Sequence, residues 1–167
     1  MNTGGGGGFG EPHFHVVLVE PEIPPNTGNV ARLCAAARCR LHLVGPLGFK
    51  MDDSSLRRAG MDYWELVDWR YHDSFDGVMM ESGLGSTVYC VETTGEQSYA
   101  EARYRPGDFL VFGRETRGLR RATIERAGGR CVRIPIAEPR ARSLNLSNAV
   151  AIVLYEALRQ NGFGDAG

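Results

Sequence analysis

Residues 15–44 read HVVLVEPEIPPNTGNVARLCAAARCRLHLV and decide the fold class. The run from His15 to Glu20 is short and almost uninterrupted in its apolar character, which is typical of a strand buried on both faces. Two prolines end it, and Asn26 or Thr27 can cap the helix that follows. Leu41 to Val44 then predicts a second strand. A strand, a helix and a strand in this order form one crossover unit of a parallel sheet.

The rest of the chain keeps this alternation. Further strands are predicted near residues 66–69, 87–91, 109–112 and 131–136, and further helices near 54–59, 73–81, 118–127 and 145–159. Connections of crossover length between successive strands favour parallel pairing. The sequence therefore predicts one α/β domain over residues 13–163, a mainly parallel sheet flanked by helices, after a flexible glycine-rich tail over residues 1–12.

Composition excludes several classes of protein. The chain has 167 residues, 43% of them hydrophobic, but no run of about 18 apolar residues that would span a membrane. It shows no secretory leader, so we expect it in the cytoplasm. The four cysteines lack metal-finger spacing, and His13 and His15 have no third ligand nearby, so we predict no metal. Because the net charge is −1, any RNA binding must depend on local arginine clusters.

Three polar segments each follow a predicted strand, and ligands of open parallel sheets bind at those carboxyl ends. The first, PPNTGNVAR, places Asn29 and Arg32 on one helix face. The second, FGRETRGL, has the glycine spacing of a phosphate loop but lacks its lysine, which leaves a tight loop with a carboxylate at Glu115. The third, RSLNLSNAV, opens an apolar helix with three polar side chains, and capping accounts for only one or two of them. Taken singly, each segment also fits an ordinary turn before a helix.

Together and in this order, the segments resemble the motifs of the SPOUT methyltransferases of the SpoU/TrmH branch, and most closely the TrmL (YibK-like) enzymes that methylate the tRNA wobble ribose. The matching stretches are EPEIPPNTGNVARLC, LRRAGMDYW, FGRETRGL, RIPI and RSLNLSNAVAIVLYEALRQ, spread over residues 16–161. The resemblance implies 2′-O-methylation of nucleotide 34 of tRNA, a cytidine or a modified uridine, with S-adenosylmethionine as methyl donor. It also implies a C-terminal trefoil knot and a homodimer.

The same resemblance assigns residues to the cofactor by their position in the motifs. Val91, Gly113, Ile134, Ser143 and Leu144 are expected to contact S-adenosylmethionine. Many of these contacts would be made by backbone groups, which explains why plain aliphatic residues serve at a binding site.

Four further residues are assigned to the RNA. Arg32 stands where the family places an arginine at the reacting site; a guanidinium stays protonated, so we expect it to bind the adjacent phosphate and to stabilise the developing alkoxide. Tyr155 stands where wobble-modifying relatives carry a tyrosine near the ribose. Its position in an apolar helix fits equally well with a structural role as a buried aromatic side chain. Arg57 and Arg58 are expected to grip the anticodon loop.

The sequence departs from the family pattern at Arg114, where relatives carry a small residue or proline, and at Arg120, where they carry proline. These two extra cations leave the identity of the target tRNA open. One alternative is a sister enzyme that methylates ribosomal RNA or another tRNA position, and another is a non-catalytic RNA-binding dimer. An oxidoreductase is disfavoured, because the pattern of Gly5, Gly7 and Gly10 precedes the first strand.

Overall fold

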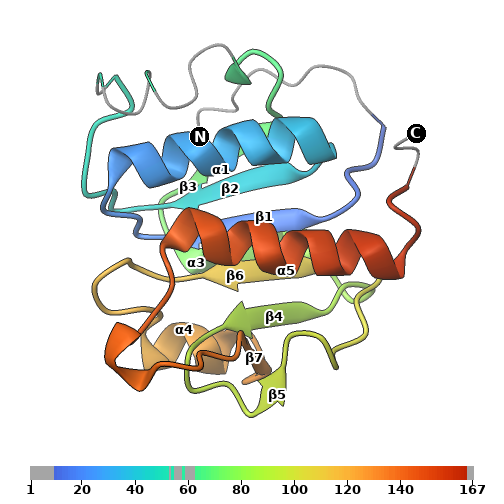
Figure 1. The fold of residues 1–167 in the computed structure, drawn as a ribbon. Coiled ribbons are helices and arrows are strands. Elements are labelled where there is room, and N and C mark those ends of the chain that lie inside the picture. The colour runs from blue at the N-terminus through green and yellow to red at the C-terminus, as the bar shows by residue number, and fades with distance from the viewer. Residues whose placement is uncertain (1–9, 53, 55–57, 59–62, 165–167) are drawn as a thin grey trace.

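A computed structural model of the protein describes residues 10–52, 54, 58 and 63–164, which form a seven-stranded sheet of order β3-β2-β1-β6-β4-β7-β5 (Figure 1). All six strand pairs are parallel. The strands are β1 (His15–Val19), β2 (Arg40–Val44), β3 (Trp69–His72), β4 (Val88–Val91), β5 (Gln97–Ser98), β6 (Phe109–Phe112) and β7 (Cys131–Arg133). The α/β class and the parallel sheet are therefore confirmed, whereas the trefoil knot stays a prediction.

Helices cover both faces of the sheet. They are α1 (Pro24–Ala37), α3 (Phe75–Ser82), α4 (Arg121–Arg126) and α5 (Leu146–Gln160), with a short 3₁₀ helix η2 (Pro139–Ala141) before α5. Helices α1 and α5 lie side by side on one face, and α3 and α4 lie on the other (Figure 1). In β1, Val16 and Leu18 belong to the core under α1 and α5, whereas Val17 and Val19 belong to the core under α3 and α4. This double burial is the reason for the apolar run that identified the strand.

Some predicted boundaries were wrong. Helix α1 begins at Pro24 instead of after an Asn26 or Thr27 cap, because proline lacks the N–H that the first helical residue leaves unused and its φ is already helical. Its N-cap is Ile23, which makes no side-chain capping bond. The strand expected near residues 66–69 begins only at Trp69, and the helix expected over 118–127 is the six-residue α4. The helix expected over 54–59 lies largely outside the described residues.

Helix α5 is apolar over most of its length, and the structure divides its apolar side chains between the core and an outward stripe. Six residues lie in the core: Leu146, Val150, Val153, Leu154, Ala157 and Leu158. The outward stripe carries Ile152 and Tyr155, which are 36% and 44% exposed. Two more exposed apolar side chains, Leu144 and Phe163, lie beyond its two ends. None of the described helices combines the length and apolar content that a membrane crossing requires.

A chain of three histidines crosses the core on the α3 side. His15 Nδ1 lies 2.9 Å from His42 Nε2, and His42 Nδ1 lies 2.9 Å from His72 Nε2. The ring of His15 also stacks on Phe109, with centroids 4.0 Å apart. In each of these hydrogen bonds one ring donates and the other accepts, so both bonds can form when the three imidazole rings are neutral.

Candidate active site

A cavity of about 500 Å³ opens at the carboxyl ends of β4, β6 and β7, beside the first residues of α1 and α5. All three polar segments singled out from the sequence contribute to its lining, together with the ends of β4 and β7. The five residues expected to contact the cofactor line this one cavity: Val91, Gly113, Ile134, Ser143 and Leu144. Positions up to 53 residues apart in the chain, from 91 to 144, are thus brought to one site, as expected for an open parallel sheet.

The loop after β6 folds back on itself and requires glycine at two positions. Arg114 and Gly118 pair as an isolated antiparallel bridge. A Cβ at Gly113 would lie 2.2 Å from the backbone carbon of Gly118, so no side chain fits there. Gly118 has φ +65°, a left-handed conformation that favours glycine. The result is a closed loop whose residues, Gly113 to Gly118, line the cavity.

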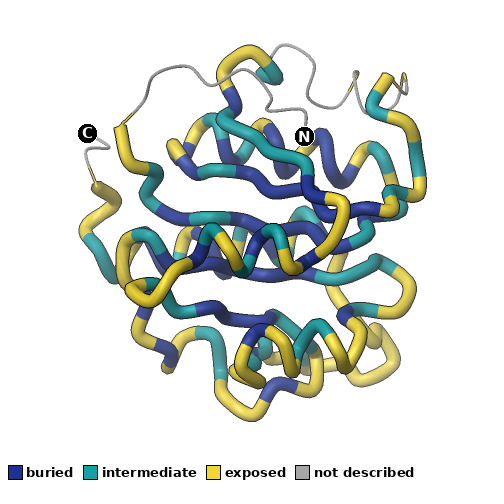
Figure 2. Tube along the Cα trace, turned by 180° about the vertical axis from the view of Figure 1, so that it is seen from behind, coloured by how far each residue is buried: buried dark blue, intermediate teal, exposed yellow. Residues whose placement is uncertain are grey.

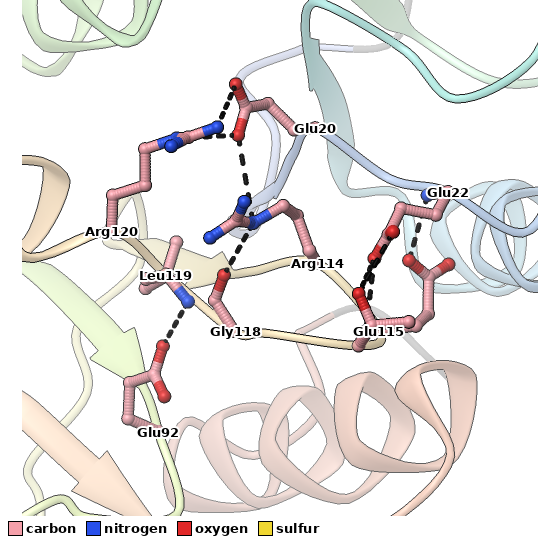
Figure 3. Close-up of polar contacts among 9 residues, drawn as sticks. Glu20, Glu22, Glu92, Arg114, Glu115, Gly118, Leu119 and Arg120 are labelled. Carbon is pink, nitrogen blue, oxygen red and sulfur yellow. Dashed lines mark hydrogen bonds and ion pairs between the residues drawn. The ribbon is translucent and has the colours of Figure 1, made fainter.

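Reciprocal carboxylate contacts clasp this loop to the start of α1 (Figure 3). Glu115 accepts the backbone N–H groups of Glu22 at 2.8 Å and Ile23 at 3.0 Å. Glu22 in turn accepts the backbone N–H of Thr116 at 3.0 Å and its hydroxyl at 2.8 Å. These two bonds from Thr116 lower the pKa of Glu22. The Glu115 carboxylate therefore serves the positive end of a helix that has no capping side chain of its own.

The start of α5 is tied to the start of α1 by two asparagines. Asn145 Oδ1 caps α5 by accepting the backbone N–H of Ser147 at 2.9 Å and of Asn148 at 3.4 Å. Asn145 Nδ2 donates to Oδ1 of Asn26 at 3.1 Å. Capping thus accounts for Asn145 and Ser147 of the polar cluster, and Asn148 is exposed to solvent.

Three of the residues assigned to RNA are absent from the cavity lining: Arg32, Arg58 and Tyr155. Arg32 is exposed on α1, and its guanidinium carbon lies 4.8 Å from the ring centroid of Tyr63, a cation–π distance. Tyr155 lies on the outward stripe of α5, and the structure does not bring it to the cavity within one chain. Arg58 is exposed, and Arg57 lies outside the described residues.

The two cations that depart from the family pattern are paired. Arg120 Nε lies 3.1 Å from Glu20 Oε2, and Arg114 Nε lies 3.9 Å from the same oxygen (Figure 3). Arg114 Nε also donates to the carbonyl of Gly118 at 3.3 Å. Glu20 therefore offsets part of the positive charge beside the loop after β6.

Sequence reasoning missed Glu92, which lines the cavity directly after Val91. Its carboxylate accepts the backbone N–H of Leu119 (Figure 3). Burial raises its pKa, and the bond from Leu119 opposes that shift only in part. A single glutamate gives no signal by its residue type. Its position could have identified it, because it stands at the carboxyl end of a strand next to a predicted contact residue.

Among the described residues, the side chains of His42, His72 and Glu81 are the group close enough to hold a metal ion, with donor atoms within 4.8 Å of one another. The two rings already bond to each other, and Glu81 is held by Arg70 at 2.9 Å. Their donor atoms thus have partners without a metal, and the absence of a metal cofactor stays a prediction.

Comparisons with known proteins agree with this geometry. The SpoU rRNA Methylase family matches residues 13–155. The tRNA (cytidine(34)-2'-O)-methyltransferase of Burkholderia pseudomallei is 51% identical, over 90% of this chain and 97% of its own, and a putative enzyme of the same name from Bacillus subtilis is 49% identical, over 91% and 96%.

Solved structures agree as well. One that concerns the 2-OH methylation of C/U34 on tRNA superposes with a TM-score of 0.85 at 46% identity, over 92% of this chain and 99% of its own. The SpoU methyltransferase AviRb from Streptomyces viridochromogenes, in complex with AdoMet, superposes with a TM-score of 0.80 at 25% identity, over 90% and 58%. The chain belongs to the SpoU methylase family.

Proposed function

We propose that this protein transfers a methyl group from S-adenosylmethionine to the 2′-hydroxyl of wobble nucleotide 34 in tRNA. The observation that carries the proposal is the convergence of Val91, Gly113, Ile134, Ser143 and Leu144 on one cavity. The names of relatives about 50% identical over nine-tenths of the chain support the reaction and the nucleotide. Because tRNA is modified in the cytoplasm, we place the protein there.

The cavity suits the methyl donor in size and chemistry. About 500 Å³ is within the range of sites for small molecules. The missing side chain at Gly113 lets a ligand approach the loop backbone, and the apolar side chains of Val91 and Ile134 suit the faces of an adenine ring. When bound, S-adenosylmethionine supplies the methyl group on a sulfonium centre. The residues of the chain hold and orient the two reactants.

Arg32 is the residue that we assign to the RNA at the reacting site. It cannot accept a proton from the ribose hydroxyl, because a guanidinium keeps its proton in proteins. It can bind the neighbouring phosphate with two N–H groups and stabilise negative charge as it develops on the 2′-oxygen. Its guanidinium lies over the ring of Tyr63 on the surface of α1, a contact that favours this orientation. The hydroxyl proton then passes to phosphate or water.

A homodimer would complete the site. The outward stripe of α5 exposes Ile152 and Tyr155, and Leu144 at the cavity mouth is 38% exposed. A second copy that covers this stripe would bury these apolar side chains and carry its own Arg32 and Tyr155 toward the cavity. We include Tyr155 as the residue beside the ribose on this basis, with Arg57 and Arg58 as the residues that bind the anticodon loop.

The proposal is tested by incubating the protein with labelled S-adenosylmethionine and tRNA from cells that lack it, followed by nucleoside mapping. We expect a 2′-O-methylated nucleoside at position 34, lost in Arg32→Ala and strongly reduced in Arg32→Lys, which keeps the charge but not the fork. Arg105→Ala is the control, because this exposed arginine precedes the amino end of β6, whereas the cavity lies at the carboxyl end of that strand. Full activity of Arg32→Lys would refute phosphate gripping by the fork. Label only in ribosomal RNA or at another tRNA position would overturn the substrate.

A further inference from the structure

Glu92 occupies a position that the known features of the site leave unexplained. It follows β4 at the carboxyl edge of the sheet and lines the cavity. The chain holds it in place at both ends: its backbone N–H donates to the carbonyl of Val132 at 3.0 Å, and its carboxylate accepts the N–H of Leu119. A Cβ at Gly118 would lie 2.9 Å from both carboxylate oxygens, so the glycine leaves the space that the carboxylate fills.

The carboxylate has no cationic partner in the part of the chain that the structure describes. The ten ion pairs found there do not include Glu92, although Arg114 and Arg117 line the same cavity. One N–H bond uses only part of the acceptor capacity of a carboxylate, which has about four lone-pair sites. A half-buried charge with unused acceptor sites at the wall of a cavity is suited to receive donors from a ligand.

The surroundings of Glu92 indicate which part of the ligand it meets. Its neighbours on the cavity wall include Val91, Phe112 and Ile134, an apolar group that suits an adenosine. The arginines Arg117 and Arg142 are exposed at the cavity and suit the charged amino-acid end of the methyl donor. The donors of an adenosine are the 6-amino group of its base and the two neighbouring hydroxyls of its ribose, and the paired hydroxyls match the two oxygens of one carboxylate.

We propose that Glu92 is a further cofactor-binding residue, whose carboxylate accepts the ribose hydroxyls of S-adenosylmethionine. This inference rests on the proposed function. Hydroxyl donors favour the ionised form of a carboxyl group, so they would offset the rise in pKa that burial imposes on Glu92. Cofactor affinity should therefore increase as the pH rises through the pKa of Glu92.

The test measures dissociation constants by calorimetry for three ligands. S-Adenosylhomocysteine carries both the diol and the amino-acid end, 5′-methylthioadenosine carries the diol alone, and its 2′,3′-dideoxy form carries neither. The variant is Glu92→Gln, whose amide oxygen can still accept from Leu119. Glu96→Gln, an exposed glutamate four residues away, is the control for loss of one negative charge.

We expect Glu92→Gln to weaken the first two ligands alike, by about ten- to a hundredfold. The dideoxy ligand should bind the wild type and the variant equally, and Glu96→Gln should change nothing. Unchanged binding of 5′-methylthioadenosine to Glu92→Gln would overturn the inference, and a loss confined to S-adenosylhomocysteine would assign Glu92 to the ammonium group instead. If the wild type bound none of the ligands, the proposed function itself would fail.

A second measurement needs no variant and so does not depend on the folding of Glu92→Gln. In the wild type, the preference for 5′-methylthioadenosine over its dideoxy form should grow with pH, because the ionised carboxylate is the better acceptor. A preference that stays constant from pH 4 to pH 8 would contradict a carboxylate contact with the diol.

Discussion

Asn145 Nδ2 donates to Asn26 Oδ1 across 3.1 Å, although the two asparagines are 119 residues apart in the chain. The bond joins the start of α1 to the start of α5. Asn26 is 6% exposed, so its side-chain oxygen depends on this partner instead of on solvent. Both asparagines line the cavity. The bond therefore sets how α1 and α5 approach each other at the mouth of the site.

Asn145→Asp should separate the two roles of this side chain. A carboxylate still caps α5 and is favoured at a helix N-terminus, but it has no N–H for Asn26 and places negative charge against its oxygen. We expect a loss of about 1–3 kcal/mol in the free energy of unfolding, measured by urea titration. Asn148→Asp adds the same charge to the same turn at an exposed position and should cost nothing. Equal stability of the two variants would show that the bond to Asn26 contributes nothing.

Gly113→Ala tests the closed loop after β6. The new Cβ would lie within 2.2 Å of backbone atoms that cannot move without opening the bridge between Arg114 and Gly118. We expect a cost of roughly 1–3 kcal/mol in stability and a larger loss of affinity for S-adenosylhomocysteine. Gly85→Ala is the control, because a Cβ there meets nothing within 4 Å. Retained affinity in Gly113→Ala would show that the loop backbone does not need its present form to bind the cofactor.

The sheet was predictable from sequence because its central strands are buried on both faces. β1 and β6 carry short apolar runs that are rich in β-branched or aromatic residues and are bounded by proline or glycine, which favours a strand over a buried helix segment. β5, the two-residue strand Gln97–Ser98, was not predictable, since it lies at the sheet edge and is set by pairing with β7. The shift of β3 to Trp69 has the same cause: an edge strand has one neighbour and a weak pattern.

The candidate site was predictable in its composition and less so in its connections. The five residues predicted from their motif positions all line the cavity, because the segments that share a family motif also lie together in the fold. It does not record partners, so the contacts from Glu115 to the start of α1 and from Glu20 to Arg120 appeared only in three dimensions. Arg32 and Tyr155 show the limit of motif transfer, because neither side chain lines the cavity of the single chain.

The histidine chain predicts acid sensitivity. Burial lowers the pKa of His15 to about 4 and also lowers the pKa of His42 and His72. The cations Arg40 and Arg70 add to the shifts of His15 and His42, and Arg70 adds to that of His72. Asp68 opposes the shift of His15, and Glu81 opposes that of His72. Because the unfolded chain takes up protons near the ordinary pKa of 6.5, the unfolded state binds more protons as the pH falls, and stability is lost.

We therefore expect full stability above pH 6.5 and a decline from pH 6.5 to pH 4. His15 alone would contribute up to about 3 kcal/mol over this range. Urea unfolding at pH 7.5, 6.5, 5.5 and 4.5 measures the decline. His15→Gln keeps an amide near His42 but does not titrate, so its decline should be shallower; an identical slope in both proteins would assign the acid sensitivity to other groups.

Glu20→Gln tests whether Glu20 limits the attraction of RNA to the cavity rim. Glu20 holds Arg120 at 3.1 Å and Arg114 at 3.9 Å, and 57% of the Arg120 side chain is exposed. Removing the carboxylate releases both cations toward phosphate. The fold then loses ion pairs in which the Glu20 side chain is only 16% exposed, at a cost of about 1–2 kcal/mol in the free energy of unfolding. We expect tighter binding of tRNA at low salt and a salt dependence steeper by about one phosphate contact. Glu101→Gln makes the same change in net charge at an exposed position elsewhere. If both variants bound tRNA alike, net charge alone would explain the gain, whereas a gain confined to Glu20→Gln would place Arg114 and Arg120 on the path of the RNA.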